Sequence, residues 1–172
     1  WPRIMPTGAR PVNQRGLDAN GELAARLADE PLFELANHGT RHVPLSVNGQ
    51  SAYGIAGSAS AQEVVDEVWG CHERLTELTG VAPRFFRSGT AHYDDVAVAI
   101  VRELGEVPVG FSTNGDAGAT FPAKTVRAEV ARTSPGGIVI AHFNQPGSGT
   151  GAGVLAAVAD LTAQGAEFVH LD

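Results

Sequence analysis

The 172-residue chain is long enough to bury a substantial core, and its length suggests one domain. A net charge of -7 without a cluster of Lys and Arg argues against a nucleic-acid partner, and no apolar segment has the length that a membrane span needs. The N-terminal residues lack the pattern of a secretion signal, and the single cysteine, Cys71, excludes an internal disulfide.

Residues 1–16, rich in Pro, Gly and Arg, are predicted to be irregular, and residues 17–172 to form one domain. Helices are expected over 17–28, from the capping box Ser60–Glu63 to Thr79, from Asp94 or Asp95 to Leu104, over 123–131 and over 153–164. Strands are expected over 32–36, 84–87, 107–112, 137–141 and 167–171. The segment 44–60 is a polar loop whose length suggests a role.

The predicted strands and helices alternate along the chain. This alternation is typical of a parallel sheet or a (β/α) barrel. The predicted strands are too few to close the usual barrel. Either the sheet is open, or part of a barrel is absent from this chain.

The first predicted strand runs into the segment 37–42, which reads Asn-His-Gly-Thr-Arg-His. Its histidines, His38 and His42, are separated by about one helical turn, so both imidazoles can point to one side of a turn that closes the strand. Such pairs also occur by chance on surface turns, so a turn that binds no metal is the alternative. Because function gathers at the carboxyl ends of strands in α/β folds, the position favours half of a zinc site.

Polar residues follow each of the first four predicted strands. In chain order they are His38 and His42; Arg87; Ser112, Asn114 and Asp116; and His142. The carboxyl ends of parallel strands meet at one edge of a sheet. We therefore expect these side chains to share one site.

Together these motifs resemble the polysaccharide deacetylases of the NodB-homology type, carbohydrate esterase family 4, from about Leu17 to Leu171. Segment 37–42 is similar to the family's Asn-His-Ser/Thr-x-x-His motif with one internal difference, and Phe86-Arg87 is similar to its arginine motif. His142 after an apolar strand resembles its last histidine. The resemblance implies an α/β fold, a (β/α) barrel of this type that is distorted and incomplete at its N-terminal strands.

The resemblance also implies metal-dependent hydrolysis of an N- or O-acetyl group on a polysaccharide such as chitin, peptidoglycan or acetylated xylan. A divalent metal, zinc with cobalt or nickel as alternatives, would be held by His38, His42 and a carboxylate. His142 would be the general acid that protonates the leaving group, and Asp116 would pair with it. Arg87 would hold the carboxylate that acts as base by a two-point hydrogen bond.

The chain departs from the family at the first motif, a strand ending in Thr-Phe-Asp-Asp that supplies the base and the third metal ligand. No such segment occurs, and the residues before Leu17 do not resemble it. We therefore expect the front of the domain to be missing, which would expose strand edges and permit a homo-oligomer. The same departure suits the alternative function, a non-catalytic or truncated domain that binds carbohydrate or a partner chain.

Three further residues are candidate substrate contacts: His92, Tyr93 and Asn144. His92 and Tyr93 follow the arginine motif. An aromatic ring there either stacks on a sugar or packs against the protein at the edge of the site. Asn144 lies in a glycine-rich segment that either cradles a sugar or forms a flexible loop. His72, on the long helix, is read as solvated or half-buried. The polymers named above imply a secreted or cell-envelope protein.

Overall fold

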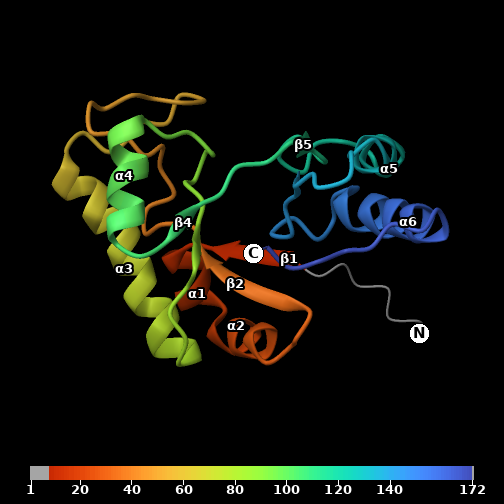
Figure 1. Ribbon diagram of the computed structural model, residues 1–172, viewed down its shortest axis with the longest axis horizontal. Coiled ribbons are helices and arrows are strands. Elements are labelled where there is room, and N and C mark those ends of the chain that lie inside the picture. Colours follow the sequence, from red (N-terminus) through yellow and green to blue (C-terminus); the bar gives the residue numbers. More distant parts are fainter. Residues whose placement is uncertain (1–7, 172) are drawn as a thin grey trace. The chain divides into compact units, whose positions relative to one another are not determined.

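Figure 1 shows the computed structural model, which describes residues 8–171. Within this range the chain forms two compact units, residues 8–109 with 170–171, and residues 110–169. Each unit has hydrophobic clusters of its own. No helix in residues 8–171 combines the length and the apolar character that crossing a membrane requires.

The unit of residues 8–109 alternates strands and helices around a parallel sheet. Its elements are β1 (Gly8–Val12), α1 (Gln14–Ala19), α2 (Gly21–Ala28), β2 (Phe33–Asn37), α3 (Ala61–Thr79), β3 (Phe85–Phe86), α4 (Asp95–Glu103) and β4 (Val107–Pro108). The strand order is β1-β2-β3-β4, and every neighbouring pair is parallel. The loops that leave β2 and β3 therefore begin at the same edge of the sheet.

Helix α3 joins the two hydrophobic clusters of this unit. One cluster contains Leu45, Val64, Val68, Phe86, Ala97 and Val101, and the other contains Leu17, Ala24, Leu35, Cys71 and Leu75. The four apolar residues that α3 contributes recur at helical spacing, so they form one buried face. Through Leu35 on β2 and Phe86 on β3, this face fixes the two strands that lead into the histidine and arginine motifs.

Capping interactions anchor the long loop 44–60 to the helices around it. The start of α3 has the predicted N-cap, because the Ser60 hydroxyl accepts a hydrogen bond from the N–H of Glu63 at 3.2 Å. The Glu63 carboxylate accepts from the N–H of Ala59 at 3.2 Å, one residue before the position that a capping box uses. Helix α4 is capped by Asp94, whose carboxylate also accepts from the N–H of Val47 at 2.7 Å. The second contact ties the loop to α4, so the loop has a fixed attachment.

The unit of residues 110–169 is built on a two-stranded parallel sheet and a helix pair. Its elements are β5 (Thr113–Asn114), α5 (Ala123–Ala131), β6 (Val139–Ile140) and α6 (Thr150–Ala163). Helices α5 and α6 lie side by side (Figure 1), with Val126, Val130 and Ala157 buried between them. Gly153 lies at the close approach, since a Cβ there would lie 2.6 Å from the carbonyl oxygen of Ala123.

The predicted irregular segment over residues 1–16 is wrong for Gly8–Val12, which forms β1, and for residues 14–16, which begin α1. Residues 1–7 lie outside the described part of the chain. Pro11 lacks an N–H, but β1 is an edge strand of its sheet, where proline is tolerated. Pairing with β2 over the whole strand makes this segment extended, although its composition does not favour a strand. The single domain over 17–172 stays a prediction.

Two other predicted elements differ in the structure. The helix expected over 17–28 is two helices, because the chain leaves the helical conformation at Asn20. Residues 166–171 have no regular structure, so the strand expected over 167–171 is wrong. This segment is held by other contacts: His170 donates to the carbonyl of Pro31, and the carbonyl of Leu171 accepts from Arg84. The other predicted strands are present, and three are shorter than expected.

Candidate functional site

The histidines of segment 37–42 follow β2 and contact each other. The ring centroids of His38 and His42 are 4.6 Å apart, with their planes at 80°. The turn between them is not helical, because Gly39 (φ 82°) and His42 (φ 65°) both adopt the left-handed conformation. The two imidazoles converge as the spacing predicts, but the turn that brings them together is not the helical turn that we expected.

The tautomer of His38 follows from its hydrogen bond. Its Nδ1 lies 2.7 Å from the carbonyl oxygen of Arg87. A carbonyl only accepts, so Nδ1 carries the proton and the neutral ring keeps a lone pair on Nε2. Metal-ligating histidines are oriented in this way, with one nitrogen donating to a carbonyl and the other facing the metal. His38 therefore has the tautomer of a metal ligand, and Nε2 is the nitrogen that would bind a metal in place of its contact with Arg87.

Arg87 reaches these histidines from β3. Its N–H donates to the carbonyl of Asn37 at 2.9 Å, which extends the β2–β3 pairing. Its Nη2 lies 3.3 Å from His38 Nε2, and a guanidinium only donates, so Nε2 is the acceptor. The structure thus brings His38, His42 and Arg87 together. The hydrogen bond from Arg87 to a base carboxylate stays a prediction.

The histidines at this site supply some, but not all, of the ligands that a zinc ion needs. Two neutral imidazoles suit zinc, and a catalytic zinc site takes three protein ligands. Residues 8–171 contain no group of three His, Cys, Asp or Glu side chains that could hold a metal ion. The described part of the chain therefore supplies two predicted ligands, His38 and His42, and the third stays a prediction.

The sequence pattern does not predict the buried polar network behind His38. The Asn37 amide donates to Glu106 Oε1 at 2.8 Å and accepts from the N–H of Gly39 at 2.9 Å. His72 Nδ1 lies 2.8 Å from the same Glu106 oxygen, and its side chain is only 14% exposed. Burial raises the pKa of the Glu106 carboxyl, although these hydrogen bonds act in the opposite direction. The bonded residues 37 and 106 are far apart in sequence, so no local pattern reveals the network.

The unit of residues 110–169 contains a second polar group. Asp116 is fully buried and accepts three hydrogen bonds: from the N–H of His142 at 2.7 Å, from its Nδ1 at 2.8 Å and from the Thr150 hydroxyl at 2.8 Å. Burial acts to raise the pKa of Asp116, but the hydrogen bonds from His142 and Thr150 outweigh it, so the pKa lies below its ordinary value. The structure thus forms the predicted pair of Asp116 and His142.

The two other polar residues predicted in this unit have local roles. The Ser112 hydroxyl accepts from the N–H of Ile138 at 2.9 Å. The Asn114 side chain accepts from the N–H of Ala117 at 2.9 Å, as in an Asx turn. These contacts join β5 and β6 and shape the turn that leads to Asp116.

The candidate substrate contacts differ in exposure. The Tyr93 ring packs against Phe86 and the core, and its hydroxyl, 2.9 Å from the N–H of Ser88, is enclosed by backbone groups. These contacts give Tyr93 a packing role. His92 is exposed and meets the Tyr53 ring edge-to-face at 5.2 Å, and Asn144 is exposed in its loop. Contact of His92, Tyr93 or Asn144 with substrate stays a prediction.

The predicted site residues therefore form two groups, one in each unit. His38, His42 and Arg87 belong to residues 8–109, and Asp116 and His142 belong to residues 110–169. The expectation that both groups share one site stays a prediction.

The comparisons with known proteins agree with these motifs. The family model described as polysaccharide deacetylase matches residues 11–109. No curated protein matches the chain. A CE4 family pseudoenzyme from Bacillus anthracis is 18% identical, with a TM-score of 0.81 over 96% of this chain and 54% of that chain.

Two further solved structures are similar. A family 4 acetyl xylan esterase from Clostridium thermocellum, in complex with a cobalt ion, is 19% identical, with a TM-score of 0.79 over 98% of this chain and 76% of that chain. The peptidoglycan deacetylase PdaC from Bacillus subtilis is 17% identical, with a TM-score of 0.75 over 96% and 74%.

These likenesses confirm the predicted fold class, an α/β fold of the distorted (β/α) barrel type found in these proteins. The described strands form two separate sheets in place of one closed barrel. The chain spans about half the length of the Bacillus anthracis protein.

Proposed function

Because the chain belongs to the polysaccharide deacetylase family, we propose that it carries part of the active site of a metal-dependent deacetylase. The reaction is the hydrolysis of N- or O-linked acetyl groups of a polysaccharide such as chitin, peptidoglycan or acetylated xylan. Water attacks the acetyl carbon, and the bond from that carbon to the sugar nitrogen or oxygen breaks. The sugar nitrogen or oxygen takes up a proton, and acetate is the other product.

The observation that carries this proposal is the arrangement of His38 and His42. Their rings are in contact, and the His38 Nδ1–H is held by the carbonyl of Arg87. These two side chains, with one further carboxylate, are the proposed ligands of a divalent metal, zinc in the first instance. When bound, such a metal polarises the acetyl carbonyl and lowers the pKa of a water ligand.

The chain's own side chains have separate proposed roles. Asp116 accepts the Nδ1–H of His142 at 2.8 Å, which leaves Nε2 as the atom that delivers a proton to the leaving nitrogen or oxygen. Arg87 orients the base carboxylate through its planar guanidinium. His92 and Asn144 are exposed and are the proposed contacts to the sugar.

The substrate class and the location follow from the same proposal. Solved structures that are similar to this chain are named as a peptidoglycan deacetylase and an acetyl xylan esterase. We therefore propose an acetylated polysaccharide or oligosaccharide as the partner, and a secreted or cell-envelope location. A homo-oligomer would cover strand edges and stays a prediction.

A second candidate function is carbohydrate binding without turnover. Residues 8–171 contain no group of three metal-ligating side chains, and a similar structure is named as a pseudoenzyme. In that case the His38–His42 pair would persist without a complete metal site, and the fold would serve as a sugar-binding or partner-binding surface.

The experiment that tests the first proposal is metal analysis of the purified chain. We expect about one zinc ion per chain, lost in His38→Ala. His170→Ala is the matched control, because His170 contacts only the carbonyl of Pro31 among the contacts described here, and it should keep the metal. Zinc that survives His38→Ala, or a metal-free wild type, contradicts the proposed site.

Acetate release separates the two candidate functions. The zinc-loaded chain is incubated with a chitin oligosaccharide and with acetylated xylan, and free acetate is measured. Release of acetate that depends on His142 supports the deacetylase. Sugar binding without acetate release supports the non-catalytic function.

A further inference from the structure

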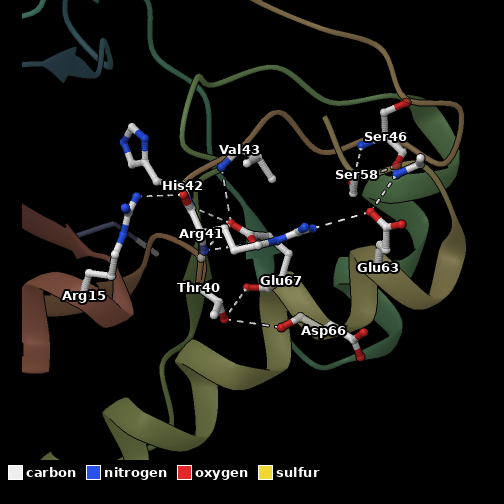
Figure 2. Close-up of polar contacts among 12 residues, drawn as sticks. Arg15, Thr40, Arg41, His42, Val43, Ser46, Ser58, Glu63, Asp66 and Glu67 are labelled. Carbon is white, nitrogen blue, oxygen red and sulfur yellow. Dashed lines mark hydrogen bonds and ion pairs between the residues drawn. The ribbon is translucent and has the colours of Figure 1, made fainter. Parts of the chain in front are cut away.

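Glu67, on α3, is buried against the histidine turn. Its side chain is only 1% exposed, although it carries a charge in its ordinary state. Figure 2 shows the carboxylate facing the backbone of segment 40–43. A buried carboxylate is unfavourable unless hydrogen bonds replace its lost hydration. The hydrogen-bond partners of the Glu67 carboxylate therefore indicate the role of this buried side chain.

Those partners are consecutive backbone N–H groups of the turn. Glu67 Oε1 accepts from His42 at 2.8 Å and from Val43 at 3.3 Å, and Oε2 accepts from Arg41 at 2.9 Å. The Arg41 guanidinium adds an ion pair at 3.3 Å. Consecutive N–H groups that converge on one anion form a nest, a known concavity for negative charge. Here the anion is a side chain of the same protein.

The turn that encloses Glu67 has an unfavourable backbone conformation. His42 has a φ of 65°, in the left-handed region that non-glycine residues seldom adopt. Gly39 has a φ of 82°, and a Cβ at Gly39 would clash with the Glu67 carboxylate. Such a conformation persists only where the surroundings hold it. The hydrogen bonds to Glu67 lie directly at the strained residue and stabilise its conformation.

The backbone of the same helix fixes the other side of the turn. The N–H of Thr40 donates to the carbonyl of Glu67 at 2.9 Å, and the Thr40 hydroxyl lies 3.2 Å from the same carbonyl (Figure 2). Gly70 permits this approach, because a Cβ there would lie 2.7 Å from the Thr40 hydroxyl. Since Val64 and Val68 bury α3 in the core on either side of Glu67, the anchor is rigid.

We propose that Glu67 is a positioning residue that holds the His42 backbone in its left-handed conformation and so presents the His42 imidazole beside His38. Glu67 acts through the backbone N–H groups of Arg41, His42 and Val43. The inference rests on the proposed function, because the imidazole pair matters as a metal site. Partners that orient metal ligands change metal affinity by about 10–100-fold when they are replaced.

The test compares Glu67→Gln with Glu73→Gln. Both variants remove one negative charge from α3, but Glu73 is exposed. In Glu67→Gln we expect cobalt(II) affinity to fall about tenfold or more and the visible spectrum of bound cobalt to change. The Glu73→Gln control should match the wild type in both. Unchanged affinity and spectrum in Glu67→Gln would overturn the inference.

A second measurement needs no metal. Amide hydrogen exchange at Arg41, His42 and Val43 should become at least about tenfold faster in Glu67→Gln, and exchange within α3 should not change. If wild type binds no cobalt, the proposed function fails, and exchange at these three amides alone decides the role of Glu67. Where Glu67→Gln does not fold, Glu67→Asp keeps the charge and retracts it by one methylene; intact protection of the turn in that variant would contradict the inference.

Discussion

At the residue scale, the pKa values of two buried carboxylates, Glu106 and Asp116, are shifted in opposite directions. Burial acts to raise the pKa of both Glu106 and Asp116. Asp116 receives hydrogen bonds on both oxygens, so its charged form is favoured and its pKa is lowered. Glu106 receives hydrogen bonds on Oε1 only, and its Oε2 has no hydrogen-bond partner within the described part of the chain, so burial prevails. Hydrogen bonds outweigh burial at Asp116, and burial outweighs hydrogen bonds at Glu106.

The raised pKa of Glu106 predicts a pH-dependent stability. The folded state holds the Glu106 proton to a higher pH than the unfolded state, so the free energy of unfolding should fall as pH rises above the ordinary Glu value of 4.5. Glu106→Gln keeps an oxygen acceptor and does not titrate, so its stability should depend less on pH across this window. Urea unfolding in a series of buffers from about pH 4 to 7 measures the two curves.

Glu103→Gln is a suitable control for this prediction, because Glu103 is exposed at the end of α4. Its pH profile should follow the wild type. Parallel profiles for wild type and Glu106→Gln would show that Glu106 does not contribute.

At the element scale, the contact between α5 and α6 depends on a glycine. Glycine is about 1 kcal/mol less favourable than alanine inside a helix, so local propensity alone argues against Gly153. The packing argues for it: a Cβ at this position would clash with Val126 on α5 and would lie 2.6 Å from the Ala123 carbonyl oxygen. The close approach of the two helices therefore outweighs the propensity cost.

Two alanine substitutions in α6 should differ in their effect on the free energy of unfolding. Gly153→Ala should lower the free energy of unfolding by about 1–3 kcal/mol, because the helices must move apart. Gly151→Ala, in the same helix with nothing within 4 Å of its Cβ position, should be neutral or raise stability by up to about 1 kcal/mol. Thermal and urea unfolding of both variants measures the difference. A stabilising Gly153→Ala would mean that the helix pair adapts without cost.

At the scale of the whole molecule, the chain is acidic, with a net charge of -7, and several of its carboxylates are held in the charged form. The pKa values of Asp94, Asp116 and Asp160 are all lowered: backbone N–H groups outweigh burial at Asp94, and Arg127 pairs with Asp160. A lowered folded pKa gives stability that is present above the unfolded pKa and is lost as pH falls through the folded pKa.

Acid should therefore unfold the protein. We expect stability to decline below about pH 4, the ordinary range of an Asp carboxyl, and to continue falling as these groups protonate. Asp116→Asn should lessen this dependence, because it removes one group with a lowered pKa. Asp29→Asn is the control, because Asp29 is exposed. Circular dichroism during acid titration follows the transition, and equal slopes for all three proteins would contradict the role of Asp116.

The features that depend on neighbours along the chain can be predicted from the amino-acid sequence. The N-cap at Ser60, the bounds of α5 and the convergence of His38 with His42 follow from short spacings, and the structure has all three. The motifs in segment 37–42 and around Arg87 and His142 were sufficient to indicate the family, which the match over residues 11–109 shows.

Features whose partners are far apart in sequence depend on how the chain folds in space. Strand β1 exists because β2 pairs with it, and Pro11 is tolerated because that strand lies at an edge. Glu67 occupies the apolar face of α3, where a charge is unexpected, and its partners lie in the histidine turn more than twenty residues earlier. Burial and hydrogen bonding depend on which segments meet in space, and no local periodicity encodes that.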